Sequence, residues 1–361
     1  MSQVAPPPIA DSNSRLRRSL QFALFTVCLL WYLMAYGLAS RAARGITTRF
    51  ALDDLRAPLS ALFLIFLLIV GLGIFAGVAR SGRMDMREAL GLPRRASMGR
   101  EWALGAAIGW GMAVAAVLPM ALFGSLHIRL FFVERAFTLL AFHLLTILLA
   151  TLASEIALRG FAFRRLIEAI GPGKATTFMA LLAALVHMIL QPWTSVSILV
   201  TMLGTILLSV AWLRTHGLWL SWGIHFAWTA ALGVLFGLPI RGDHELASVI
   251  QTRAIGSAWL TGRAIGAEGA LFTMLVLLVG IIVLVRSTGD YAWEYTRPEI
   301  ISAGYAVDVP PPAAHVATEN PVPPPPPPLV QILPAAPPPP PPPPPLPSEP
   351  DGGPQNSPDF S

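Results

Sequence analysis

Long stretches without charged residues alternate with arginine-containing segments along residues 1–297. A helix needs about 20 mainly apolar residues to cross the hydrocarbon core of a bilayer, so charged residues indicate where such helices end. Charge-free stretches of about this length or longer lie between Arg18 and Arg41, Arg56 and Arg80, Glu101 and Arg129, Arg135 and Glu155, Lys174 and Arg214, Arg214 and Arg241, and Glu268 and Arg286. The pattern predicts transmembrane helices in all of them.

The stretch between Lys174 and Arg214 is too long for one helix. Gln191-Pro192-Trp193 interrupts it, and a proline ends a helix because it lacks a backbone donor and clashes with the preceding turn. We therefore expect a helical hairpin here, which brings the total to about eight spans. The predicted fold class is an all-α polytopic membrane protein, with a short cytoplasmic segment at residues 1–18 and a transmembrane helical domain at residues 19–290.

The composition supports the membrane as the solvent of this chain. Of its residues 54% are hydrophobic and 12% are charged, whereas an ordinary soluble domain has about 25% charged residues. The isoelectric point is near 10.0, but the arginines gather at the ends of apolar stretches, where they orient helices in a bilayer. We therefore expect a lipid bilayer as a partner and no binding of nucleic acid. The single cysteine, Cys28, excludes a disulfide within the chain.

The distribution of basic residues predicts the orientation. With eight spans both termini lie on one side, and 16 of the 25 Lys and Arg residues fall on that side. Positively charged loops remain in the cytoplasm, so both termini are predicted to be cytoplasmic. The near-absence of lysine suggests a GC-rich bacterial genome, and hence a multi-pass protein of the bacterial inner (plasma) membrane.

The C-terminal segment 298–361 has a different character. It holds 25 of the 34 prolines and six acidic residues, and it contains neither Lys nor Arg. Such a segment cannot bury enough apolar surface to fold and favours extended polyproline II structure. We expect a disordered, acidic, proline-rich tail. It acts either as a spacer or as a docking segment for a proline-binding partner, and the spacer is favoured because no basic residue flanks the proline runs.

A few ionisable residues fall inside the predicted spans, where each is a functional candidate because its burial in lipid is costly. Glu155 and Arg159 are spaced i, i+4, so they share a helix face and can pair. A structural ion pair alone would explain them. His187 and His225 lie within their own predicted spans, at depths that would let the two imidazoles meet.

These residues occur in three ordered motifs. Ser154-Glu155-Ile156-Ala157-Leu158-Arg159-Gly160 is followed by Ala183-Ala184-Leu185-Val186-His187, and then by Gly217-Leu218-Trp219-Leu220 and His225-Phe226-Ala227-Trp228-Thr229. The set resembles the intramembrane endopeptidase (CPBP) family of type II CAAX prenyl proteases and Abi-type bacteriocin-immunity proteins. The motifs of that family read Glu-Glu-x-x-x-Arg, Phe-x-x-x-His and His-x-x-x-Asn. The resemblance covers about residues 135–235.

The resemblance implies roles for these positions. The first glutamate and the second-motif histidine, His187 here, would activate a water that attacks a peptide carbonyl. The third-motif histidine and its partner, His225 and Thr229 here, would stabilise the oxyanion, and Arg159 would orient the first motif. Two positions depart from the family pattern. Ser154 stands where the first glutamate is expected and cannot act as a carboxylate base. Thr229 replaces an asparagine but can still donate a hydrogen bond.

Two interpretations follow. In the first, Glu155 replaces the missing base, and the protein hydrolyses peptide bonds of a membrane-associated protein or peptide. A shift of one residue turns a helical side chain by about 100°, and Arg159 competes for Glu155, so this replacement is geometrically demanding. In the second, the protein is a degenerate member of the family that binds or scaffolds partners in the membrane, as an immunity protein would.

Neither interpretation needs a cofactor. Two histidines and a glutamate can ligate a divalent metal such as zinc, but the sequence lacks a second carboxylate in the motif and a His-x-x-x-His helix pair. A metal site is therefore the less supported alternative.

Overall fold

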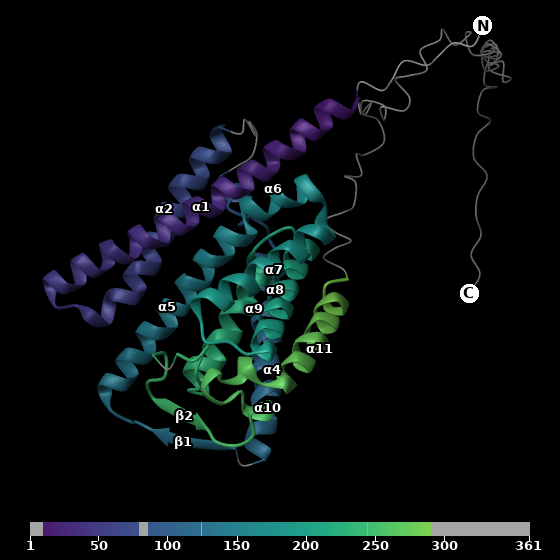
Figure 1. The fold of residues 1–361 in the computed structure, drawn as a ribbon. Helices are drawn as coiled ribbons and strands as arrows, with labels where there is room; N and C mark the ends of the chain where they lie inside the picture. The colour runs from purple at the N-terminus through teal and green to yellow at the C-terminus, as the bar shows by residue number, and fades with distance from the viewer. Residues whose placement is uncertain (1–9, 79–85, 124, 244, 290–361) are drawn as a thin grey trace, which may run out of the picture. The chain divides into compact units, whose positions relative to one another are not determined.

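The computed structural model describes residues 10–78, 86–123, 125–243 and 245–289 (Figure 1). The chain divides into two units, Met1–Glu299 and Ile300–Ser361. The predicted proline-rich tail lies outside the described residues, so its disorder remains a prediction.

The described part is mainly helical (Figure 1). Its long helices are α1 (Ala10–Phe50), α2 (Arg56–Val78), α4 (Met98–Leu122), α5 (Glu134–Arg159), α7 (Pro172–Leu190), α8 (Ser195–Thr215) and α11 (Leu271–Ser287). Shorter helices are α3 (Met86–Ala89), α6 (Phe161–Ile170), α9 (Trp219–Ala230) and α10 (Ala258–Thr261). Single turns are η1 (Asp53–Leu55), η2 (Ala231–Leu235), η3 (Arg263–Ile265) and η4 (Ala267–Gly269).

Six helical segments among the described residues are long and apolar enough to cross a membrane. They are Leu16–Phe50, Asp53–Gly77, Met98–Leu122, Glu134–Ile170, Pro172–Leu190 and Ser195–Thr215. Large apolar side chains on these helices face outward, for example Leu181, Leu185 and Ile189 on α7, which are 55%, 53% and 70% exposed. Because a soluble helix would cover such a face, the protein is a membrane-embedded multi-helix protein. The predicted seventh and eighth spans correspond to α9 with η2 and to α11, which are shorter.

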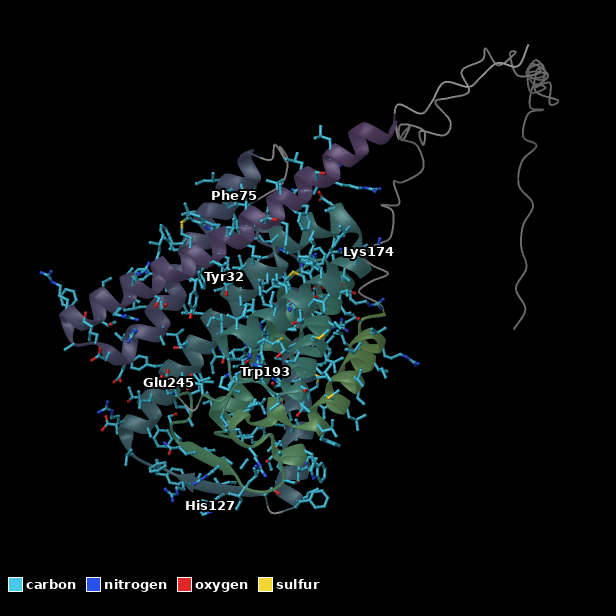
Figure 2. The ribbon with its side chains drawn as sticks, viewed as in Figure 1. Tyr32, Phe75, His127, Lys174, Trp193 and Glu245 are labelled. Atoms are coloured by element: carbon cyan, nitrogen blue, oxygen red, sulfur yellow. The ribbon has the colours of Figure 1, made fainter. Side chains whose placement is uncertain are left out.

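The hairpin predicted at Pro192 is present. Helix α7 ends at Leu190 and α8 begins at Ser195, and Figure 2 labels Trp193 in the turn between them and Lys174 near the start of α7. A reciprocal cap starts α8, because the Thr194 hydroxyl accepts from the Ser197 amide (3.1 Å) and the Ser197 hydroxyl accepts from the Thr194 amide (2.8 Å).

A two-stranded antiparallel ribbon departs from the all-α prediction. Strand β1 (Leu126–Leu130) pairs with β2 (Ile250–Ala254), with Leu126 opposite Ala254 and Leu130 opposite Ile250. The sequence assigned β1 to the end of a transmembrane helix, because the apolar pattern there continues beyond Leu122.

The buried apolar side chains form two main clusters. One joins α4, α8, α9 and α11 through residues such as Met112, Leu207, Ile224 and Leu277. The other joins α1, α2, α5, α6 and α7 through residues such as Phe25, Leu68, Ile156, Phe163 and Met179. Helix α5 packs in the second cluster but also contacts α9 of the first, and the first and third motifs meet at this contact.

Helices α4 and α9 approach each other at glycines. A Cβ atom at Gly105 or Gly109 would overlap the backbone carbonyl oxygen of Leu220 or Ile224, and one at Gly223 would overlap that of Trp102. Small residues that let two backbones come this close are typical of helix pairs in membranes. The contact fixes α9, and therefore His225, against α4.

Candidate active site

The Glu155 carboxylate joins the first motif to the third. Its Oε1 atom accepts a hydrogen bond from Arg159 Nη1 at 2.8 Å and one from His225 Nδ1 at 2.8 Å. Glu155 is fully buried, and the Arg159 side chain is 4% exposed. The ion pair predicted from the i, i+4 spacing is therefore present, and it includes a histidine from a helix about 70 residues away in the sequence.

The contact with Glu155 determines which ring nitrogen of His225 carries the proton. A carboxylate only accepts hydrogen bonds, so Nδ1 of His225 carries the proton and donates to Oε1. In the neutral ring Nε2 is then a proton acceptor, and in the protonated ring it is an N–H donor. The side chain is 24% exposed, so it remains accessible. The contact has the geometry by which the carboxylate of a catalytic triad orients its histidine through Nδ1.

Ser154 points away from this contact. It is half-buried, and its hydroxyl donates to the Thr151 carbonyl oxygen of its own helix at 2.9 Å. The position therefore supplies neither a carboxylate nor a contact with a neighbouring helix. Arg159 and His225 occupy the Oε1 atom of the neighbouring Glu155, whose Oε2 atom is buried without a hydrogen-bond partner among the described residues.

His187 lies apart from the Glu155 contact. It is 4% exposed near the end of α7, and both ring nitrogens face hydroxyls on α8. Nε2 is 3.2 Å from Ser197 Oγ, and Nδ1 is 3.4 Å from Thr201 Oγ1. The structure thus joins Glu155, Arg159 and His225 in one cluster and binds His187 to a different helix.

The remaining candidates have simpler surroundings. Thr229 is half-buried on α9, one turn after His225 and on the same side of the helix. His143, an earlier histidine on α5, lies 3.0 Å from the Leu246 carbonyl oxygen through Nδ1 and contacts neither of the two histidine sites described above.

A second carboxylate, which the sequence did not single out, lies on the turn η4, which packs against α8. Glu268, on the turn η4, and Arg241 both interact electrostatically with His187. Trp228 Nε1 of α9 donates to Glu268 Oε1 at 3.3 Å, and Arg241 Nε lies 3.7 Å from Glu268 Oε2. In the sequence Glu268 served only to end a charge-free stretch. Glu268 lies far from the three motifs in the sequence, so the sequence gives no sign of its contacts with Trp228 and Arg241.

No group of three or more His, Cys, Asp and Glu side chains in the described ranges is placed to hold a metal ion. Two surface cavities also lie away from the motif residues. Residues that include His127, Arg129 and Arg253 of the ribbon line one of them, and residues that include Arg164 and Trp212 beside α6 line the other.

Comparison with known proteins identifies the segment that carries the motifs. Neither the curated proteins nor the solved structures contain a match to this chain. Residues 136–231 match the family model described as type II CAAX prenyl endopeptidase, Rce1-like. This segment begins in α5 and ends just after α9, so it contains all three motifs. The resemblance inferred from the motifs is confirmed, and this segment of the chain is similar to the type II CAAX prenyl endopeptidases.

Proposed function

We propose that the protein is a CAAX-protease-like endopeptidase of the membrane, which hydrolyses a peptide bond in a membrane-associated protein or peptide. The observation that carries the proposal is the Glu155 carboxylate, bound at 2.8 Å by both Arg159 and His225. Burying charged groups is costly unless they are paired, and this pairing fixes the orientation of a histidine from the third motif.

In this proposal Glu155 positions His225 and does not activate the water. Held through Nδ1, His225 directs Nε2 away from Glu155, and Thr229 lies one turn further along the same helix face. A substrate carbonyl beside them would be polarised by the imidazolium N–H and the hydroxyl, which is the way an oxyanion is stabilised. His187 would lie on the other side of the attacking water. The mechanism uses side chains and water and requires no cofactor.

The second candidate function is that of a degenerate relative, which binds or scaffolds membrane partners and hydrolyses nothing, as a bacteriocin-immunity-like protein would. Ser154 is the observation that favours it, because its hydroxyl is bound to its own helix and offers no base. A tail that docks a proline-binding partner would suit the same function.

We also propose eight spans in the bacterial inner membrane, with α9–η2 and α11 as the seventh and eighth and both termini in the cytoplasm. Reporter fusions after residues 192 and 289 test this arrangement. The fusion in the α7–α8 turn is expected to report the external side and the fusion after α11 the cytoplasm.

The proposed activity is tested with a library of quenched fluorogenic peptides and the purified protein in detergent. Native protein should cleave a subset of the library, and His225→Ala should lower kcat/KM by at least about 100-fold, in the range of a positioned acid–base or oxyanion group. His143→Ala is the matched control, because it removes a histidine of α5 that lies outside the site. Equal cleavage by His225→Ala and the native protein, or no cleavage by the native protein, would contradict the proposal.

A further inference from the structure

The missing first carboxylate raises the question of which group takes the proton from the water. Peptide hydrolysis by water needs a base within hydrogen-bond reach of it. Ser154 cannot serve. Glu155 holds Arg159 and His225 through Oε1, while its Oε2 atom is buried without a hydrogen-bond partner among the described residues. A base from outside the first motif, near His187, would leave the ion pair of Glu155 with Arg159 intact.

Glu268 meets this requirement. It is a carboxylate that interacts electrostatically with His187, and its side chain is only 14% exposed. One oxygen, Oε1, accepts from the Trp228 indole at 3.3 Å. The other, Oε2, is buried and accepts no hydrogen bond from the described residues, since Arg241 Nε is 3.7 Å away. A buried carboxylate oxygen without a donor is costly, and a water molecule is a small donor that would satisfy it.

Trp228 connects Glu268 to the third motif. It lies three residues after His225, so the two side chains share a face of α9. Turn η4 also packs against α8, the helix whose Ser197 and Thr201 hydroxyls face His187. Glu268 is thus anchored to the helix of His225 and lies beside the helix that contacts His187.

Two glycines shape the loop that carries Glu268. Gly262 and Gly266 have φ values of +65° and +86°, in the region that favours glycine. A Cβ atom at Gly262 would overlap the Gly266 carbonyl oxygen, and one at Gly266 would overlap that of Pro239. The Gly242 amide also donates to the Ile265 carbonyl oxygen at 3.2 Å. Such a turn holds a side chain in place before substrate arrives, as a catalytic base requires.

We propose that Glu268 is the general base of the reaction and replaces the carboxylate that position 154 lacks. This inference rests on the proposed function. The Glu268 carboxylate takes a proton from the water while the water oxygen forms a bond to the peptide carbonyl carbon. The electron pair of the carbonyl π bond moves to the carbonyl oxygen. When the intermediate collapses, the C–N bond breaks and the proton passes to the leaving amine nitrogen. The products are a carboxylic acid and an amine, which become a carboxylate and an ammonium ion by transfer of the acid proton, and Glu268 is ionised again.

The test uses the peptide that the native protein cleaves fastest, with Glu268→Gln, Glu268→Asp and the control Glu245→Gln. Glutamine preserves the shape and the acceptor for Trp228 but cannot take a proton. We expect kcat to fall by about 100- to 10,000-fold with KM within about threefold, as is usual for loss of a general base. The kcat of Glu268→Asp should be at least tenfold higher than that of Glu268→Gln. Glu245, exposed on the neighbouring loop and labelled in Figure 2, should be replaceable without effect.

The outcomes separate the two proposals. If the native protein cleaves and His225→Ala does not, but Glu268→Gln retains a kcat within about threefold of native, the assignment of Glu268 is overturned and the proposed function stands. Failure of the native protein to cleave any peptide overturns the proposed function and this inference with it. A melting temperature of Glu268→Gln equal to that of the native protein shows that a lost rate reflects lost chemistry.

Discussion

The two ionic clusters of this protein use their carboxylates differently. Between α5 and α9, the Glu155 carboxylate binds a guanidinium and an imidazole, each at 2.8 Å. Beside α8, Glu268 has one hydrogen bond of 3.3 Å and a counter-charge 3.7 Å away that is 46% exposed. A buried carboxylate with close partners serves to fix the groups around it. One with distant partners retains the capacity to bind a water. Each carboxylate keeps one buried oxygen without a hydrogen-bond partner among the described residues. In our proposal the first cluster positions His225 and the second provides the base.

Removing the tightly paired carboxylate should have the largest effect on stability. Glu155→Ala leaves the Arg159 charge buried without compensation, which costs about 3–5 kcal/mol. The free energy of unfolding in detergent, followed by tryptophan fluorescence during denaturant titration, measures it. Glu245→Ala is the control and should change stability by less than about 0.5 kcal/mol. A Glu155→Ala protein as stable as the control would show that the first cluster is not a structural unit.

The next effect concerns the hydroxyl that faces His187. Ser197→Ala removes a bond to Nε2 and half of the reciprocal cap at the start of α8, so we expect a loss of about 1–2 kcal/mol. Ser195→Ala, at an exposed position in the same turn, should be nearly neutral. The same denaturant titration compares the two. Equal stability of the two variants would mean that His187 does not depend on α8 for its orientation.

The link between the clusters should contribute less. Trp228→Phe keeps the aromatic packing but removes the donor to Glu268 Oε1, at a cost of about 1 kcal/mol. If Trp228 also positions the proposed base, kcat should fall by about tenfold while KM is unchanged. Trp193→Phe replaces a tryptophan of the α7–α8 turn that is 51% exposed and should leave both quantities as they are. If Trp228→Phe retains the native kcat, Trp228 of α9 does not position Glu268 for the reaction.

The smallest effect is expected at Arg241. Its ion pair with Glu268 is long and partly exposed, so Arg241→Gln should change stability by at most about 1 kcal/mol. The difference should shrink when salt is raised from about 0.05 to 0.5 M, because an exposed pair is screened. A loss above about 2 kcal/mol that is insensitive to salt would place Arg241 in the same class as Arg159.

Local sequence patterns predicted the features that depend on neighbouring residues. The turn at Pro192 and the pair of Glu155 with Arg159 both follow from rules that span a few positions. The ribbon did not follow, because β1 and β2 pair across more than 100 residues. Strand β1 alone reads as the apolar end of a span, and β2 lies in the predicted loop between Arg241 and Glu268.

The sequence likewise predicted the candidate site only in part. The motifs identified Glu155, His187 and His225, yet their spacing could not show that His187 turns toward uncharged hydroxyls on α8. The approach of Glu268 to Trp228 depends on how the segment after α9 folds back. No periodicity in that segment encodes it, since its course is set by glycine turns and loop contacts.

The glycine contact between α4 and α9 has a consequence for how a substrate could enter. With the carbonyl oxygens of Leu220 and Ile224 filling the space beside Gly105 and Gly109, α9 can neither slide nor rotate without the two backbones colliding. In the proposed reaction His225 would therefore stay fixed relative to α4. An opening that admits the proposed peptide substrate from the lipid would have to come from other helices. Helix α7 is a candidate, because its outer face of leucine and isoleucine is exposed among the described residues.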